Sequence, residues 1–315
     1  MSQIITKQML QSLEAGKPIS GVLLLRTCTM QYTKAGKEYM VGLLSSEIDV
    51  PFKSWNNSTA FKELKENDYT NVISYIVGTV DDYGGQISII IDKIEAVAGF
   101  TIDQFLANKY NVDAYWNALV NLIQAKVTPE AFEIAKKVMF ENNEVIDKFK
   151  LEFAAKSHHD NCKGGLLAHT YKVVSNLNFI LTQYVGIVGT DTKKIDLLYL
   201  GALFHDIGKI YEMHLGAYQT ISVAKHQFIG TEIVGNFKSD IVEKFSSEFY
   251  YQLMSIILQH HGQFGEPPKT VAAYIIHKAD MLDSDMTLLL QLMESPMQDS
   301  SGDKIKIDSD YLTLM

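Results

Sequence analysis

The stretch Leu203-Phe204-His205-Asp206-Ile207-Gly208-Lys209 places an adjacent histidine and aspartate inside an apolar run. Such a pair makes a poor core, because a buried charge is costly unless it is paired or coordinates a metal ion. Imidazole nitrogens and carboxylate oxygens are good ligands for a borderline divalent ion such as manganese, iron or zinc. The pair therefore predicts a metal site that needs further ligands from elsewhere in the chain.

Candidate ligands occur on both sides of this pair, in apolar or glycine-flanked segments. They are His169, His226, His260, His261 and Asp280. Each interval between successive candidates allows a helix and its connection, so a helical bundle can bring one residue per helix to a common centre. A lone histidine in a helical sequence is more often a surface or satisfied core residue. The joint pattern instead predicts a metal site with more ligands than one ion needs, and therefore two ions.

This pattern resembles the HD superfamily of metal-dependent phosphohydrolases, whose signature is a histidine, a His-Asp doublet and a distal aspartate. The chain matches the signature positions with His169, His205, Asp206 and Asp280. It matches the extra ligands of members with two metals with His226, His260 and His261. The match covers about residues 155–295, and the resemblance implies a bundle of helices there. The ligand set favours manganese, with iron, zinc, cobalt or magnesium as alternatives.

Asp206 is the candidate to bridge the two ions, because a shared carboxylate can bind two ions close together. Two ions sharing Asp206 would lower the pKa of a bridging water, position it opposite the leaving oxygen and offset charge on the phosphoryl group. On a helix, Lys209 would share a face with His205 and Asp206 and contact a substrate phosphate. The alternative is a helix-terminal lysine favoured by the helix dipole. The sequence has no GxxxxGK[ST] loop or GxSxG elbow that would suggest another mechanism.

Other polar residues near these ligands have less certain roles. His158 and His159 precede Gly164-Gly165, where a flexible backbone could approach a phosphate closely. We expect His159 to donate a proton to the leaving group and His158 to orient the substrate, with a simple loop role as the alternative. His277 lies one turn before the distal aspartate and can orient a ligand. Asp283 lies one turn after it and can do the same or face solvent.

The N-terminal part carries the alternating pattern of a small β-domain. Strands are predicted over residues 21–30, 38–44, 48–55, 72–80 and 86–91, with short helices over 1–15 and 60–67. Three strands, a helix and two further strands follow the order of an OB-fold, a five-stranded barrel whose exposed strands often bind single-stranded nucleic acid. The sequence therefore predicts an all-β OB-fold barrel before the helical bundle.

Aromatic residues on the predicted strands are candidate stacking platforms for bases. Tyr39 and Trp55 are the preferred pair, each worth ~1–3 kcal/mol per base if it stacks. Tyr32, Phe52 and Tyr83 are further candidates, and about half of the five aromatics are expected to fill the barrel instead. A local basic strip of Arg26, Lys34, Lys37 and Lys53 is also predicted, although a solvated turn explains the first two lysines equally well.

The predicted domain order is an OB-fold domain over residues 1–97, a linker over 98–112 and a helical HD domain over 113–315. A length of 315 residues supports two domains. Helical patterns begin at Asp113 and at Thr128-Pro129. The polar stretch 295–310 is expected to be loop or partly disordered.

Composition limits the function classes. Hydrophobic residues at 47% describe a soluble globular protein, no apolar run is long enough to span a bilayer, and no secretory signal is evident, so we expect a cytoplasmic protein without a membrane partner. The two cysteines, Cys28 and Cys162, exclude a disulfide framework or a thiolate zinc cluster. The net charge of −9 argues against a broad electrostatic grip on nucleic acid. It leaves room for a small basic groove or for phosphate held by metal ions.

An OB-like domain followed by an HD domain resembles the YhaM-like 3′-to-5′ exoribonucleases, and residues 157–170 and 258–262 look like their site segments. The resemblance implies metal-dependent removal of nucleotides from the 3′ end of single-stranded RNA, with DNA as a further substrate. The barrel would guide the strand, and the resemblance also suggests a homo-oligomer.

Other functions remain open at this point. A nucleotidase or nucleoside triphosphatase could use the same metals. A cyclic-dinucleotide phosphodiesterase of the HD-GYP class would want a GYP segment after the histidine pair, where this chain has Gly262-Gln263-Phe264-Gly265-Glu266-Pro267-Pro268. The non-enzymatic alternative is a nucleic-acid-binding regulator with a structural metal site.

Overall fold

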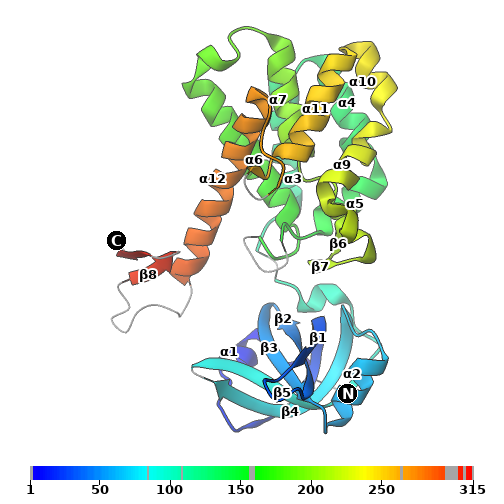
Figure 1. Cartoon of the computed structure of the whole chain (residues 1–315), viewed down its shortest axis with the longest axis vertical. Coiled ribbons are helices and arrows are strands. Elements are labelled where there is room, and N and C mark those ends of the chain that lie inside the picture. Colours follow the sequence, from blue (N-terminus) through cyan, green and yellow to red (C-terminus); the bar gives the residue numbers. More distant parts are fainter. Residues whose placement is uncertain are drawn as a thin grey trace. The chain divides into compact units, whose positions relative to one another are not determined.

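The computed structural model describes residues 3–83, 85–107, 109–155, 160–262, 265–294, 304–307 and 310–313. The chain divides into two compact units, Met1–Lys109 and Tyr110–Met315 (Figure 1). Part of the predicted linker belongs to the first unit. Its 3₁₀ helix Ile102–Phe105 buries Phe105 completely, and the Phe105 carbonyl accepts a hydrogen bond from the Glu47 amide at 2.8 Å. This segment is therefore anchored to the barrel.

The first unit is a closed barrel with the strand order β1-β2-β3-β5-β4. Its strands are β1 (Pro18–Tyr32), β2 (Glu38–Ser46), β3 (Ile48–Trp55), β4 (Val72–Tyr83) and β5 (Gln86–Ala96). Helix α1 (Lys7–Gln11) precedes the barrel, and α2 (Thr59–Glu66) separates β3 from β4. Strand order and helix position are those of an OB-fold, so the predicted fold of this unit is confirmed.

Strand β1 closes the barrel because it pairs with both β2 and β4. A register shift between Leu25 and Thr27 bends it, as a bulge does. Inward side chains, including Leu23, Phe52 and Ile76, form the barrel core. Each such buried side chain stabilises the fold by about 1.5–3 kcal/mol. The chain thus uses its apolar alternation to close a small barrel and leaves its outward residues free for other roles.

The second unit is predominantly helical. Its helices are α3 (Val112–Lys126), α4 (Pro129–Ala135), α5 (Asn143–Leu151), α6 (Gly165–Gln183), α7 (Thr192–Phe204), α8 (Lys209–Glu212), α9 (Lys225–Gly235), α10 (Lys238–Lys244), α11 (Ser247–Gln259) and α12 (Val271–Glu294). Two small two-stranded sheets accompany them, β6 (Met213–His214) with β7 (Ala217–Tyr218) and β8 (Lys304–Ile307) with β9 (Asp310–Thr313). The predicted helical bundle is confirmed. The tail prediction was wrong for β8 and the start of β9, where backbone pairing forms strands.

Helix α6 lies at the centre of the bundle, packed against α3, α7 and α12 (Figure 1). Its apolar side chains, such as Leu166, Val173 and Leu177, are fully buried. Asp196 on α7 fixes the start of α4, because its carboxylate accepts hydrogen bonds from the Thr128 amide at 2.8 Å and from the Thr128 hydroxyl at 2.6 Å. This framework holds α6, α7, α11 and α12 together, and most of the candidate ligands lie on these helices or directly after them.

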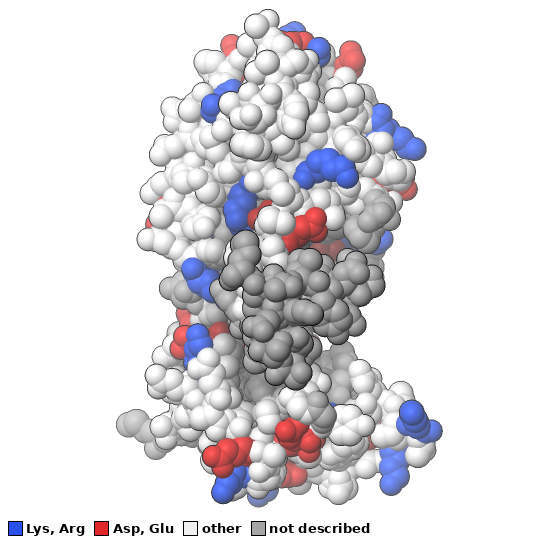
Figure 2. Space-filling model, turned by 90° about the vertical axis from the view of Figure 1, so that its left-hand side faces the viewer, with Lys and Arg blue, Asp and Glu red and all other residues white. Residues whose placement is uncertain are grey.

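Charge on the surface is mixed. Figure 2 shows Lys and Arg interspersed with Asp and Glu on one face, where the positive side chains form separate spots. The described residues of that face therefore form no broad cationic surface, in keeping with the net charge of −9. Within the part of the chain that the structure describes, no helix has the length and apolarity that crossing a membrane requires.

Candidate metal centre

The predicted ligands come from five places in the helical unit. His169 lies in the second turn of α6, and His205 and Asp206 follow the end of α7. His226 lies in the first turn of α9, while His260 and His261 follow α11. Asp280 lies within α12. The structure brings all of these residues together, from segments that are far apart in the sequence.

The sequence analysis placed His205, Asp206 and Lys209 on one helix face, and this was wrong. Helix α7 ends at Phe204, and α8 begins at Lys209 after a turn. Gly208 makes the turn feasible, since a Cβ there would lie 2.0 Å from the His226 carbonyl oxygen. Only glycine therefore lets this turn approach α9 so closely.

The two carboxylate oxygens of Asp206 face two different groups of histidines. Oδ2 lies 3.4 Å from Nε2 of His169 and 3.4 Å from Nε2 of His205. Asp280 joins this group, with Oδ1 3.3 Å from Nε2 of His169. We call His169, His205, Asp280 and Oδ2 of Asp206 the Asp280 half of the centre.

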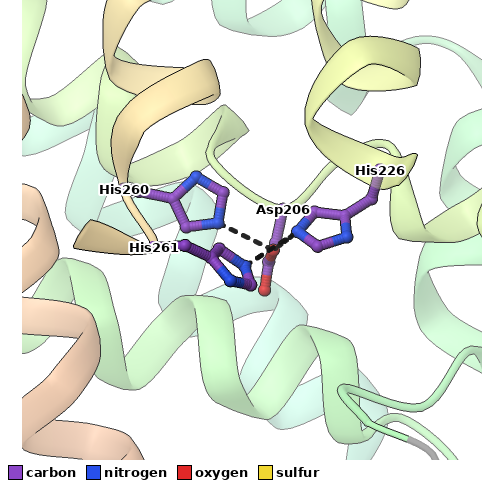
Figure 3. A group of neighbouring side chains, drawn as sticks. All are labelled: Asp206, His226, His260 and His261. Carbon is purple, nitrogen blue, oxygen red and sulfur yellow. Dashed lines mark hydrogen bonds and ion pairs between the residues drawn. The ribbon is translucent and has the colours of Figure 1, made fainter. Parts of the chain in front are cut away.

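The other oxygen of Asp206, Oδ1, lies 3.3 Å from Nε2 of His226 and 3.4 Å from Nε2 of His260. His261 completes this group, with its Nε2 3.0 Å from Nε2 of His226. Figure 3 shows the three imidazoles converging on the Asp206 carboxylate. We call these three histidines and Oδ1 of Asp206 the His261 half. In this half, one potential ligand atom from each residue lies within 4.8 Å of all the others.

Backbone carbonyls orient one histidine in each half. His205 Nδ1 donates to the Ala202 carbonyl at 2.8 Å, and His260 Nδ1 donates to the Ile257 carbonyl at 2.8 Å. An imidazole that donates through Nδ1 keeps the lone pair of Nε2 for a metal ion. In both residues, that Nε2 is the atom that faces the centre.

Carboxylates orient a second histidine in each half. His169 Nδ1 lies 2.7 Å from Oδ2 of Asp283, and His226 Nδ1 lies 2.8 Å from Oε2 of Glu212. Asp283 therefore orients a candidate ligand and is buried, whereas the sequence had left solvent exposure open. Glu212 was missed, because a single glutamate at a helix end has no distinguishing sequence pattern. Such carboxylates fix the ring orientation and raise its basicity.

The donor set fits divalent cations. Among the residues that the structure describes, Oδ1 of Asp206 and Nε2 of His260 are buried and have no hydrogen-bond partner. A buried polar atom without a partner costs about 1–3 kcal/mol, so such atoms need an explanation. A cation in the His261 half would satisfy both, together with Nε2 of His226 and His261. The Asp280 half offers nitrogen and oxygen donors of the same kind.

The halves differ in the pKa values of their histidines. Burial, helped by the neighbouring His260, lowers the pKa of His261 to about 3, so this ring is neutral near pH 7. Burial alone would also lower the pKa of His169, but Asp206, Asp280 and Asp283 outweigh it and raise that pKa well above its usual value. Without a cation, His169 therefore binds a proton far more readily than His261 does.

Lys209 reaches the centre from α8. Its Nζ lies 2.7 Å from Oδ2 of Asp206 and donates to the Ala154 carbonyl at 2.7 Å. Burial alone would raise the pKa of Asp206, but the charges of Lys209 and His205 hold it well below its usual value. Lys209 begins α8, so a helix dipole gives no reason for a cation at this position. The contact with Asp206 is the better account of its placement.

The remaining candidates near the centre have different outcomes. His158 and His159 lie outside the described residues. His277 donates through Nδ1 to the carbonyl of His260 at 2.7 Å, so it holds the backbone of a candidate ligand. Gly262, with φ +57°, makes this contact feasible, because a Cβ there would lie 2.4 Å from the His277 ring.

The barrel aromatics divide into surface and core. Tyr39 and Trp55 are cross-strand partners whose rings stack with centroids 5.1 Å apart. Tyr32 and Tyr83 are exposed. Phe52 is only 1% exposed, so it fills the barrel and is not a stacking platform.

The predicted basic strip is incomplete. Arg26 is buried, and its Nη1 lies 3.4 Å from Oδ1 of Asp49, so it is held in an ion pair and is not part of an exposed strip. Lys53 pairs with Asp81 at 3.7 Å, and its Nζ lies 5.6 Å from the centroid of the Tyr83 ring. Lys34 and Lys37 lie at the β1–β2 connection and at its end. Two of the four predicted cations are therefore paired with carboxylates, which leaves the exposed aromatic rings as the main candidate contacts of this unit.

Comparison with known proteins agrees with this geometry. Residues 166–285 match the family model described as HD domain. The chain is 27% identical over 299 residues to the 3′-5′ exoribonuclease YhaM of Bacillus subtilis, with 89% of each chain covered. It is 26% identical to the YhaM exoribonuclease of Bacillus velezensis, again with 89% of each covered.

A mitochondrial single-stranded DNA binding protein from S. cerevisiae is similar at 13% identity, with a TM-score of 0.25, covering 28% of this chain and 100% of that chain.

The match to the family model shows that the helical unit contains an HD domain, as the ligand pattern predicted. The chain is accordingly a metal-dependent phosphohydrolase, and its similarity to the YhaM-type exoribonucleases, which the sequence analysis also noted, is confirmed.

Proposed function

We propose that this protein is a cytoplasmic 3′-to-5′ exoribonuclease that removes nucleotides from the end of single-stranded RNA, with manganese as the favoured metal. The observation that carries the proposal is Asp206, whose two oxygens each face a separate group of metal-ligand atoms. This arrangement suits a centre of two ions, which is one of the arrangements that enzymes use to cleave phosphodiesters. The similarity to YhaM exoribonucleases over 89% of the chain supports the RNA end as the substrate.

In this proposal, the two histidine groups and the distal aspartate hold the ions, and Asp206 is shared between them. Bound divalent ions would supply an activated water and offset the charge that develops on the phosphoryl group. The Ala154 carbonyl and Oδ2 of Asp206 occupy two of the three N–H groups of Lys209, so the third can donate to a phosphate oxygen. His159 remains the proposed proton donor to the leaving oxygen, and His158 the proposed substrate contact.

The barrel would hold the RNA strand through its bases. Tyr39 and Trp55 present a stacked pair on β2 and β3, and Trp55 is 36% exposed. Base stacking on such rings is tolerant of sequence, as an exonuclease that shortens many strands requires. It also suits a protein with net charge −9, because it depends less on cations than backbone binding does.

The direct test is to incubate the manganese-loaded protein with single-stranded RNA labelled at its 5′ end. We expect a ladder of products that shortens from the 3′ end, and a parallel DNA strand will establish the preference between the two. A cyclic dinucleotide and a nucleoside triphosphate should be tested beside it. Hydrolysis of either small substrate without any ladder would contradict the exoribonuclease proposal in favour of a phosphodiesterase or a nucleotidase. Asp206→Asn protein serves as the control for contaminating nucleases.

A further inference from the structure

A partly buried lysine lies behind the Asp280 half and has no role in the chemistry proposed above. Lys172 is on α6, three residues after His169. Its Nζ lies 2.7 Å from Oδ2 of Asp160, 3.0 Å from Oδ1 of Asp283 and 3.0 Å from Oγ1 of Thr287. An ammonium has three N–H donors, so these three oxygens satisfy it completely. Lys172 touches no ligand atom of the centre in any of these contacts.

The two carboxylates extend this cluster in opposite directions. Asp283 uses its other oxygen, Oδ2, to accept from His169 Nδ1 at 2.7 Å. Asp160 uses its Oδ1 to accept from the Tyr110 hydroxyl. A continuous chain of hydrogen bonds and ion pairs therefore runs from Tyr110 through Asp160, Lys172 and Asp283 to the ring of His169. We call these residues the Tyr110 relay.

Asp160 is held in its place at a conformational cost. Its φ is +55°, a left-handed conformation that non-glycine residues adopt only when the surrounding structure enforces it. Its carbonyl oxygen lies over the start of α6, because a Cβ on Gly165 would lie only 1.9 Å from it. The Asp160 carbonyl also accepts a hydrogen bond from the Ala154 amide at 3.1 Å. The backbone thus fixes the carboxylate that in turn fixes Lys172.

The charge balance explains why a cation is needed at this point. The Asp160 and Asp283 side chains are only 1% and 4% exposed, so two carboxylates there would repel each other without a counter-charge. Asp160, His169 and Asp283 also have the composition of a metal site, but the ammonium of Lys172 already bridges the two carboxylates. Lys172 therefore takes the place of an ion and sets which Asp283 oxygen faces His169.

We propose that Lys172 is a positioning residue for the ion in the Asp280 half. By holding Asp283, it fixes the plane and the tautomer of His169, so that Nε2 faces the centre. The His261 half has a different device. There, Glu212 binds both the ring and the backbone amide of His226, at 2.8 and 3.1 Å. Loss of Lys172 should consequently weaken the binding of the ion in the Asp280 half and leave the binding of the ion in the His261 half unchanged.

The test is manganese titration of full-length Lys172→Met protein, which keeps the length of the side chain and removes its charge and donors. This proposal rests on the metal centre of the proposed function, but the titration uses no RNA. A negative result in the exoribonuclease assay therefore does not decide the result of this metal titration. We expect the affinity for one of the two ions to fall about 10–100-fold and the other to stay within error. Unchanged affinity for both ions in a folded variant would overturn the proposal.

Lys244→Met is the matched control. The Lys244 side chain is 23% exposed against 26% for Lys172, and its Nζ pairs with Glu133 at 2.8 Å on α4. This substitution removes a lysine of similar exposed fraction from an ion pair that has no contact with a candidate metal ligand. We expect this variant to bind both ions like the unmodified protein. Equal weakening in both lysine variants would show a general effect of charge or folding, contrary to the proposal.

A double variant separates positioning from mere stability. If Lys172 acts through Asp283, the Lys172→Met/Asp283→Asn protein should bind the weakened ion no less tightly than Asp283→Asn alone. Additive losses would show that Lys172 acts independently of Asp283, and would overturn the relay. If Lys172→Met fails to fold, Tyr110→Phe decides the matter, since it removes one hydrogen bond and no charge. It should weaken the same ion by a smaller factor, and no change would count against the relay.

Discussion

The two halves of the metal centre share Asp206 but differ in charge. The Asp280 half contains a second carboxylate as a candidate ligand and has Asp283 directly behind His169. The His261 half contains three imidazoles and only the shared carboxylate. Oxygen-rich sites favour harder ions and imidazole-rich sites favour borderline ones. The two halves are therefore not equivalent, and each should respond in its own way to substitution and to pH.

The largest effect is expected where the two halves meet. Asp206→Asn keeps almost the same volume but removes the charge that both halves share. Turnover on single-stranded RNA should fall by several orders of magnitude, while circular dichroism shows a folded protein. A folded variant with near-normal hydrolysis would exclude this cluster as the catalytic centre.

Lys209→Ala should have a smaller effect, although Lys209 contacts the same carboxylate. The variant loses one cation toward the substrate phosphate, which typically costs about 2–4 kcal/mol in the transition state. We expect the loss of kcat to rank well below that of Asp206→Asn when both are measured on one RNA. If Lys209→Ala proved the worse of the two, the lysine and not the shared carboxylate would be the main contributor to catalysis.

Substitutions confined to one half should remove one ion each. Unmodified protein loaded with manganese should contain more than one ion per chain, and a reproducible value below one would contradict the two-ion arrangement.

Asp280→Asn and His261→Gln should each lower the affinity for one ion by about 10–100-fold, a typical loss for residues around a metal. Elemental analysis with competing zinc should show that the two variants lose different ions. Loss of the same ion in both would contradict the division into halves.

The barrel should influence the strand and not the chemistry at either half. Trp55→Ala removes an exposed ring that is worth ~1–3 kcal/mol per stacked base. We expect a higher KM on long single-stranded RNA, with little change in kcat and in manganese content. Phe61→Ala is not a suitable control because that ring is buried, whereas Tyr251→Ala changes an exposed ring of the other unit. Equal effects of Trp55→Ala and Tyr251→Ala would argue against a strand-binding role for the barrel.

The sequence predicted the barrel and the main ligands because both leave periodic or chemically unusual patterns. Alternating apolar residues gave the strands, and histidines in apolar segments gave the cluster. The residues that orient the ligands leave no such pattern. Glu212 and Lys172 are ordinary charged residues until folding places them beside His226 and Asp283. The burial of Arg26 was also missed, because its partner Asp49 lies on β3 and only the pairing of both strands with β2 brings the two side chains together.

In metal-free protein, His261 and His169 should change the stability of the fold in opposite directions as the pH falls. His261 has a folded-state pKa lowered to about 3, against about 6.5 in an unfolded chain. Between these values the unfolded chain binds the extra proton, so His261 makes the protein lose stability as the pH falls. His169 has a raised folded-state pKa, so its contribution is fully present below about 6.5 and is lost as the pH rises through the folded value.

These signs can be separated by comparing His261→Gln and His169→Gln with unmodified protein in urea, without metal, from a pH above the folded-state pKa of His169 down to about pH 4. As the pH falls, the free energy of unfolding of His261→Gln should rise relative to that of the unmodified protein, because the variant no longer carries the unfavourable term. His169→Gln lacks a favourable term, so its relative stability should be lower at acid pH than at a pH above the folded-state value. Parallel curves for both variants would show that the charge difference between the halves does not govern the titration of their histidines.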